Sequence, residues 1–202
     1  MPPSLQSFIP PVLPSQSYLV DIYSALGSPI KAFSVDKVLA SSGVNLTNNA
    51  IRFVAVWLAQ PSLITGIAFY SKVAGVFTGN NENRLALFSY SAGTQTRVAI
   101  TANDETIWKN TANTFVQVPF TATYSAAKGL YFVGIIYNNS AQTTAPQIDM
   151  TAIGTPNGTQ SNVLFSNSAF TTGQITAQNT MPSSIAINTI TPVTGVPWVA
   201  LY

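Results

Sequence analysis

The sequence predicts an all-β protein, an antiparallel, jelly-roll-like β-sandwich that carries an extended, proline-rich N-terminal arm. Short segments rich in β-branched and aromatic residues recur between turn formers at spacings of about eight to twelve residues, as in sandwiches and jelly rolls. No segment keeps a helical period of apolar residues over a convincing length. The prolines cluster in the first 16 residues, where they exclude regular helix.

The arm spans residues 1–16, and its prolines are interleaved with apolar residues. Proline fixes φ and lacks an amide donor, so this segment is expected to be extended. A flexible linker is one interpretation of such a composition. We expect instead an anchoring arm that docks on a neighbouring protein through four apolar side chains, Phe8, Ile9, Val12 and Leu13.

We expect residues 17–202 to form the sandwich. SYLVDIYS at 17–24 alternates as a strand does and ends at the turn-forming LGSP. IRFVAVWLAQP at 51–61 and SLITGIAFYSKV at 62–73 predict two strong strands, joined as a hairpin or as a sandwich corner. Residues 75–83 are dense in turn formers and predict a loop.

Further strands are predicted on both sides of a polar loop at 102–113. RLALFSYS at 84–91 and RVAIT at 97–101 precede this loop. FVQVPFTATY at 115–124 and GLYFVGIIYNN at 129–139 follow it, and both are rich in β-branched and aromatic residues.

The last part of the chain, residues 139–202, is poor in charge, with Asp149 as its one charged residue. We expect it to pack on the sandwich or on neighbouring subunits. Short strands are predicted at 163–165 and 184–190, and the closing WVALY at 198–202 is expected to pair back into the sandwich or into a neighbour.

Composition restricts the function. Charged residues make up 7% of the chain, against roughly 25% in typical soluble proteins, while Ser, Thr and Asn supply 59 of the 202 residues. Uncharged polar groups are cheaper to desolvate than ions, so such a surface suits large permanent contacts. The net charge is +2 with no cluster of Lys or Arg, which argues against nucleic-acid binding.

The chain contains no histidine and no cysteine. Their absence removes the commonest general base, the His-containing triads, the thiol nucleophile and the usual zinc ligands. We therefore expect a protein that is not an enzyme and that holds no cofactor and no metal. Asp104 and Glu105 could suggest a glycosidase pair, but adjacent loop residues rarely aim both carboxyls across one sugar.

Two short polar segments deserve comparison with calcium sites, Asn80–Asn83 and Asn103–Glu105. Neither has the ligand spacing of a calcium loop such as the EF-hand, so we interpret both as structural turns.

Aromatic and amide side chains are the candidates for binding a glycan. Trp57 lies within a predicted strand and is expected in the core, and Trp198 belongs to the closing strand. Trp108 lies in a polar loop, where it could stack on a sugar or cap the end of the sandwich. The candidate glycan-binding residues are Trp108, Asn138 and Asn139.

Under half of the chain, from about residue 51 to residue 138, resembles a known family. WLAQPSLITGIAFYSKVAG, NRLALFSYSAGT and FVQVPFTATYSAAKGLYFVGIIYNN resemble the jelly-roll domains of bacteriophage minor tail, fibre and head-fibre proteins. The most specific motif is a glycine-bounded aromatic strand, Gly129–Gly134, preceded by a Thr/Tyr strand. The resemblance implies a virion component, often a homotrimer, that is anchored by one terminus, and it implies no catalytic residue.

The sequence thus leads to the expectation of a non-enzymatic phage structural protein. Its arm would dock on a capsid, tail or baseplate protein, and its sandwich would project as a fibre, decoration or host-attachment module, as a homo-oligomer with a trimer favoured. A host-surface glycan is a further candidate partner. No run of 18 to 20 apolar residues and no secretory signal is present, so we expect synthesis in the host cytoplasm, no membrane span and a location in the virion. The alternative is a carbohydrate-binding module outside any virion.

Overall fold

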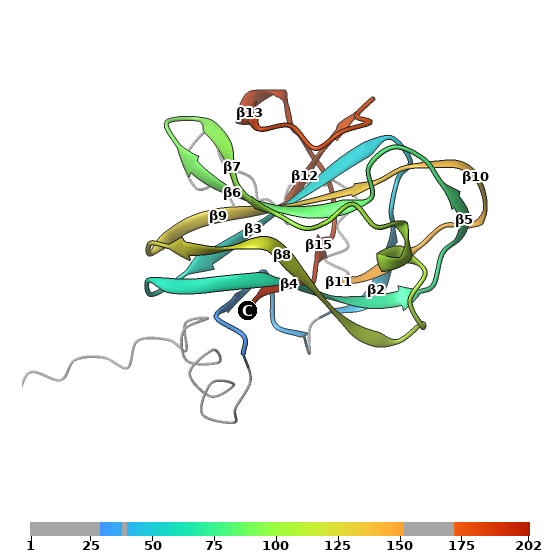
Figure 1. Cartoon of the computed structure of the whole chain (residues 1–202), viewed down its shortest axis with the longest axis horizontal. Helices are drawn as coiled ribbons and strands as arrows, with labels where there is room; N and C mark the ends of the chain where they lie inside the picture. The colour runs from blue at the N-terminus through green and yellow to red at the C-terminus, as the bar shows by residue number, and fades with distance from the viewer. Residues whose placement is uncertain (1–28, 38–39, 152–171) are drawn as a thin grey trace, which may run out of the picture.

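The computed structural model describes residues 29–37, 40–151 and 172–202 (Figure 1). Two antiparallel sheets of seven strands face each other, and a two-stranded ribbon lies at one end of them. The predicted antiparallel sandwich is confirmed. The arm at 1–16 and the strands expected at 17–24 and 163–165 lie outside the described residues.

The first sheet has the order β1-β16-β4-β11-β15, with β2 also paired to β11 and β8 also paired to β4. The longest strands of this sheet are β4 and β8, of 12 and 13 residues, which pair along most of their length. The strands of this sheet are β1 (Ala32–Phe33), β2 (Ala40–Asn45), β4 (Ser62–Val73), β8 (Thr114–Ala126), β11 (Gln147–Thr151), β15 (Val196–Pro197) and β16 (Val199–Leu201).

The second sheet has the order β13-β7-β6-β9-β3-β12-β14. Its centre is the pairing of β9 with β3, which is in register from Leu58 opposite Gly129 to Ala50 opposite Tyr137. The strands of this sheet are β3 (Ala50–Leu58), β6 (Arg84–Ser91), β7 (Thr94–Ile100), β9 (Gly129–Tyr137), β12 (Thr172–Thr176), β13 (Ser184–Ala186) and β14 (Thr191–Pro192).

The ribbon pairs β5 (Val76–Gly79) with β10 (Asn139–Thr144). The described residues also include the short 3-10 helices η2 (Glu105–Trp108) and η4 (Ile187–Thr189). The expectation of a loop over residues 75–83 was therefore wrong for its first half. The turn formers bend the chain only after Gly79, because β10 offers the preceding backbone a partner for its hydrogen bonds.

The strands β3 and β4 form a sandwich corner and not a hairpin, since they belong to different sheets. Pro61 stands between them, and a proline lacks the amide hydrogen that a continued ladder needs. The closing residues pair back into the sandwich: β16 lies between β1 and β4 in the first sheet.

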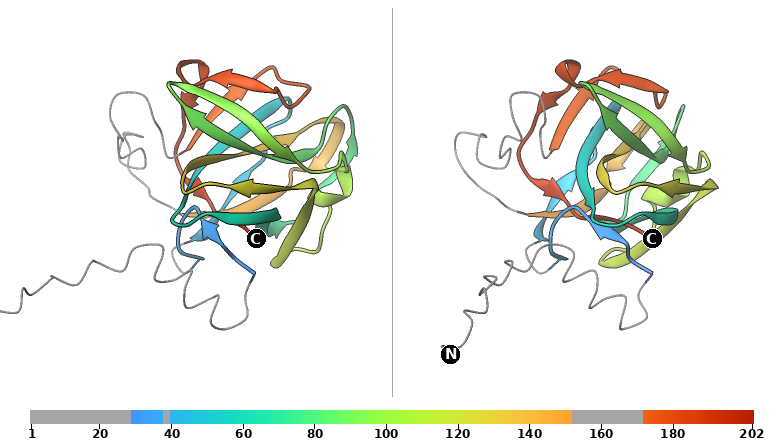
Figure 2. Two further views of the ribbon diagram at one scale, coloured as in Figure 1. Left: turned by 60° about the vertical axis from the view of Figure 1, so that its left-hand side comes forward. Right: turned by 90° about the vertical axis from the view of Figure 1, so that its left-hand side faces the viewer.

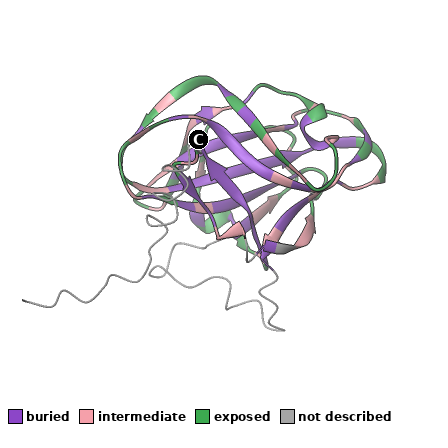
Figure 3. Ribbon diagram, turned by 90° about the horizontal axis from the view of Figure 1, so that it is seen from below, coloured by how far each residue is buried: buried purple, intermediate pink, exposed green. Residues whose placement is uncertain are grey.

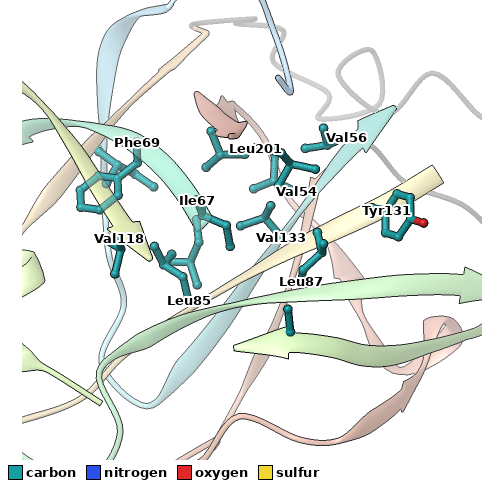
Figure 4. Close-up of a cluster of buried hydrophobic side chains, with 14 of the residues drawn as sticks. Val54, Val56, Ile67, Phe69, Leu85, Leu87, Val118, Tyr131, Val133 and Leu201 are labelled. Carbon is teal, nitrogen blue, oxygen red and sulfur yellow. The ribbon is translucent and has the colours of Figure 1, made fainter. Parts of the chain in front are cut away.

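One apolar cluster fills the space between the two sheets (Figure 4). Successive side chains of a strand point to opposite faces, so alternate residues of each strand enter this cluster. Figure 4 labels Val54 and Val56 of β3, Ile67 and Phe69 of β4, Leu85 and Leu87 of β6, Val118 of β8, Tyr131 and Val133 of β9, and Leu201 of β16.

The outer face of the second sheet is apolar as well, and the chain after β12 covers it (Figure 2). The intervening residues of β3, β6 and β9 contribute Phe53, Phe88 and Phe132, all fully buried. The rings of Phe53 and Phe88 meet edge to face at 5.4 Å. Gly134 of β9 leaves room for them, since a Cβ there would lie 2.8 Å from the Phe88 ring. The covering residues are Met181, Ile187 and Ile190.

The outer face of the first sheet is buried in part, since the outward side chains of β8 alternate with buried ones and are mostly exposed. Ala68, Trp198 and Ala200 on this face pack with Phe33 and Ala40 in a third buried cluster. Figure 3 shows this sheet from outside: β4 carries a run of buried residues, Gly66–Phe69, whereas β8 alternates between buried and exposed positions. Strands covered on both faces read as continuous apolar runs, which explains sequences such as GLYFVGIIY.

Two arginines of the second sheet bind the backbone of the covering segment. The Arg52 guanidinium donates hydrogen bonds to the carbonyls of Thr194 and Gly195, at 2.6 and 2.8 Å. Burial lowers the pKa of Arg52 to about 10, so the side chain remains protonated at neutral pH. Arg97 donates to the Met181 carbonyl at 2.6 Å. These bonds fasten the cover at both of its ends.

The covered outer face predicts a large effect of Phe88→Ala. We expect the free energy of unfolding to fall by about 3–5 kcal/mol, as for a deletion within a packed core, measured by urea denaturation. Leu63→Ala, at an exposed apolar position, is the control and should change stability by less than about 0.5 kcal/mol. A loss below about 1 kcal/mol for Phe88→Ala would mean that this face is not covered.

Candidate functional site

Trp108, expected in an exposed or capping position, is buried. It ends the 3-10 helix η2, whose N-cap Asp104 accepts a hydrogen bond from the Thr106 amide at 2.8 Å. Its ring lies 5.2 Å from that of Phe69, and the side chain is 2% exposed. Stacking on a sugar requires an exposed ring face, so the role of glycan platform is corrected here. Trp108 instead caps one end of the core.

Asn138 and Asn139 are also buried, and their amides bind the protein itself. Asn83 and Asn138 are joined twice: the Asn138 amide donates to Asn83 Oδ1 at 3.0 Å, and Asn83 Nδ2 donates to the Asn138 carbonyl at 2.9 Å. Asn138 Nδ2 donates to the Glu82 carbonyl at 2.7 Å. The Asn139 amide donates to Asn48 Oδ1 at 2.8 Å. These side chains hold loops together, and Asn138 Oδ1 is buried without a hydrogen-bond partner.

Tyr137 belongs to the same end of the sandwich. Its hydroxyl donates to Gln142 Oε1 at 2.8 Å, and Asn139 Nδ2 donates to the same oxygen at 3.1 Å. Burial raises the pKa of Tyr137 to about 12, so the phenol is neutral at physiological pH and acts as a donor. The side chains fix the ribbon β5–β10 to the sandwich.

The two segments compared with calcium sites lie beside each other. The Asn83 amide donates to Asn103 Oδ1 at 2.7 Å, and Asn103 Nδ2 donates to the Asn81 carbonyl at 3.3 Å. Together the loops line an open hollow of about 500 Å³. Glu105 at its edge is paired with Lys109 at 3.0 Å. Within the described ranges, no group of three or more His, Cys, Asp or Glu residues could hold a metal ion.

An aromatic surface lies on the outside of the first sheet, next to the start of the described chain. It consists of Phe115 and Tyr70 together with Ile30 and Lys37, and the buried rings of Trp198 and Phe33, which are 3% and 2% exposed, lie beneath them. Phe115 is 58% exposed, and its ring meets those of Tyr70 and Trp198 at 4.9 and 5.3 Å. Around them the surface is hollowed by about 100 Å³.

The charge of the aromatic surface is balanced. Lys37 Nζ lies 2.6 Å from Asp149 Oδ2 and 4.2 Å from the centre of the Tyr70 ring. Asp149 is 1% exposed, so the ion pair anchors the lysine at the edge of the hollow. An apolar group that covers this surface therefore meets a neutral pair and not an isolated cation.

Trp57, expected in the core, is 47% exposed. It follows Phe53 and Ala55 on the outer face of the second sheet, near the end of β3 and opposite Leu130 of β9. The expectation was wrong because the apolar sequence of a strand does not indicate which of its residues a distant segment of the chain covers. Of the three tryptophans, Trp57 is the one with an exposed ring.

The arm residues Phe8, Ile9, Val12 and Leu13 lie outside the described residues.

No protein-family model matches the chain, and no curated protein matches its sequence. Among the described residues there is no helix of the length and hydrophobicity needed to cross a membrane.

The amide network predicts that Asn83→Ala destabilises the fold. The Asn138 amide would lose its acceptor in a buried position, which costs about 1–3 kcal/mol in the free energy of unfolding. Asn80→Ala is the matched control, since this exposed asparagine lies in the same loop, and it should cost less than about 0.5 kcal/mol. Equal urea midpoints for the two variants would contradict a structural role for Asn83.

Proposed function

We propose that this chain is a non-enzymatic structural protein of a bacteriophage particle. Residues 1–16 anchor it to a capsid, tail or baseplate protein, and the sandwich is displayed as a fibre, decoration or host-adsorption module. The observation that carries the proposal is the aromatic surface, which lies beside Ile30, where the chain that leads from the arm enters the sandwich. A partner that holds the arm would meet this surface too.

The sandwich itself supports the display role. The apolar outer face of the second sheet is covered by the same chain, and the two sheets enclose a buried cluster between them, so the domain has a core of its own. Such a domain can be carried at the end of an arm without help from a partner. The described chain also enters and leaves at one place, because β1 pairs with β16 (Figure 1).

Composition supports a permanent assembly. The chain lacks histidine and cysteine, and its polar groups are mostly hydroxyls and amides, which an interface buries at lower cost than ions. We propose a homo-oligomer, with a trimer favoured, located in the virion. The apolar side chains exposed on the described surface, Trp57, Leu63, Val76 and Phe115, are candidates for contacts between subunits or with the particle.

The test of anchoring is a full-length variant in which Phe8, Ile9, Val12 and Leu13 are all replaced by Ser. We expect the unchanged chain to co-sediment with particles assembled in its presence, and the variant to be depleted more than tenfold, since each buried apolar side chain contributes about 1.5–3 kcal/mol. Quantitative mass spectrometry of gradient-purified particles measures both.

A Ser4→Ala, Ser7→Ala double variant controls for changes in the arm that spare its apolar residues. If the unchanged chain is not found in the purified particles, the phage assignment is contradicted. Equal loading of the Ser variant would contradict anchoring by the arm.

A carbohydrate-binding module outside any virion is the second candidate, and the exposed ring of Trp57 favours it. If a sugar stacks there, Trp57→Ala should weaken glycan binding about threefold to tenfold, because ring contacts are worth about 0.5–1.5 kcal/mol. A glycan array followed by titration calorimetry measures this. Phe115→Ala, on the other sheet, is the control. Absence of any bound glycan, or equal affinity of Trp57→Ala, would reject this candidate.

A further inference from the structure

A row of apolar side chains crosses the outer face of the second sheet, next to the part of that face that is covered. Trp57 of β3 lies opposite Leu130 of β9. The register of β9 with β6, continued by one residue, sets Leu130 opposite Tyr90. Trp57 and Leu130 point outward, because Val56 and Tyr131 beside them enter the cluster between the sheets and successive residues alternate.

The row is most open at Trp57, which is 47% exposed, and it closes beyond Tyr90. Leu130 and Tyr90 are half-buried. The Tyr90 ring meets that of Phe132, on the covered part of the face, edge to face at 5.9 Å. Gln95 of β7 lies opposite Tyr90 and is fully buried. The part of the row that a ligand can reach therefore runs from β3 over β9 to β6.

The two aromatic residues of the row are spaced like alternate sugars of a straight glycan chain. Neighbouring strands lie about 4.8 Å apart, so Trp57 and Tyr90, with β9 between their strands, lie about 10 Å apart. In a β-1,4-linked chain each sugar is turned over relative to the one before it. Alternate sugars therefore present the same face, at nearly this spacing, and the apolar face of a sugar stacks on an aromatic ring.

We propose that this row binds a straight, neutral, β-1,4-linked glycan chain of at least three sugars. One sugar stacks on Trp57, the next lies over Leu130, and the third stacks on Tyr90. These three side chains carry no charge, so a neutral chain covers them without leaving a charge unpaired. The inference rests on glycan binding at Trp57, the second candidate above, and names the class of glycan.

The exposed area favours a glycan over a second copy of the chain. A large aromatic side chain has about 250 Å² of surface, so an exposure of 47% leaves about 120 Å² at Trp57. Leu130 and Tyr90 add less, because both are half-buried. A stable protein interface needs about 800 Å² on each partner. A sugar chain needs only the faces of the rings.

Titration calorimetry of the full chain with glucose and N-acetylglucosamine oligomers tests the length of the site. We expect the affinity for β-1,4-linked chains to rise about threefold to tenfold from the disaccharide to the trisaccharide, which is the size of one ring contact. The α-1,4-linked trisaccharide of glucose, whose chain curves, should show no such gain over its disaccharide.

Tyr90→Leu keeps an apolar side chain beside Phe132 and removes the ring. This variant should lose the gain from disaccharide to trisaccharide and keep the affinity for the disaccharide, whereas Trp57→Ala should weaken binding of both. Tyr70→Leu is the matched control, because Tyr70 is also half-buried and meets Phe115 edge to face, on the other sheet. Urea denaturation checks that each variant is folded.

The outcomes separate this inference from the candidate on which it rests. Equal affinities for the disaccharide and the trisaccharide, or a gain that survives Tyr90→Leu, would overturn the extended row. If Trp57→Ala still weakens binding in that case, the candidate itself stands. Failure of all these β-1,4-linked chains to bind would overturn the inference, and the glycan array described above then decides the candidate by itself.

Discussion

The structure depends on the covering of its second sheet, which is apolar on both faces. A sandwich ordinarily buries one face of each sheet and leaves the other to water. Here Phe53, Phe88 and Phe132 face away from the space between the sheets, and each contributes about 1.5–3 kcal/mol only if something removes it from water. The chain supplies the cover from its C-terminal part. Without this segment the outer face of the second sheet would be a large apolar patch of the kind that drives association.

This constraint also decides where polar groups can act. Three cations bind groups of the chain itself: Arg52, which is buried, and Arg97 donate to carbonyls of the C-terminal segment, and Lys37 pairs with the buried Asp149. The asparagines at the opposite end bind backbone groups of the loops and so replace regular hydrogen bonding there. What remains for recognition is apolar surface that the cover does not reach, at Trp57 and at Phe115. The aromatic surface around Phe115 lies beside Ile30, near the start of the described chain.

The sequence predicted most strands because local pattern is enough to find them: β3, β4, β6, β8 and β9 lie where apolar and β-branched runs indicated. It did not predict which residues of those strands are exposed, since that depends on segments far away in the chain. For this reason Trp57, expected in the core, lies beyond the covering segment and is exposed, whereas Trp108, expected in a polar loop, is buried against Phe69. An asparagine such as Asn138 likewise looks the same in sequence whether it binds a ligand or a distant backbone amide. The short strands β1, β2, β14 and β15 carry little pattern of their own and form because an edge of a sheet is available to them.

Native-state hydrogen exchange tests most directly whether cover and sheet form one cooperative unit. The cover is represented by the amide of Met181, which donates to Glu82 Oε2 at 2.7 Å, and by the amide of Ile187, which donates to the Gly93 carbonyl at 2.9 Å. The account predicts that both amides exchange with the same opening free energy as the amides of the central strand β9, through global unfolding only. Exchange of Met181 and Ile187 through an opening of much lower free energy, with β9 still protected, would contradict the claim that the sandwich depends on its cover.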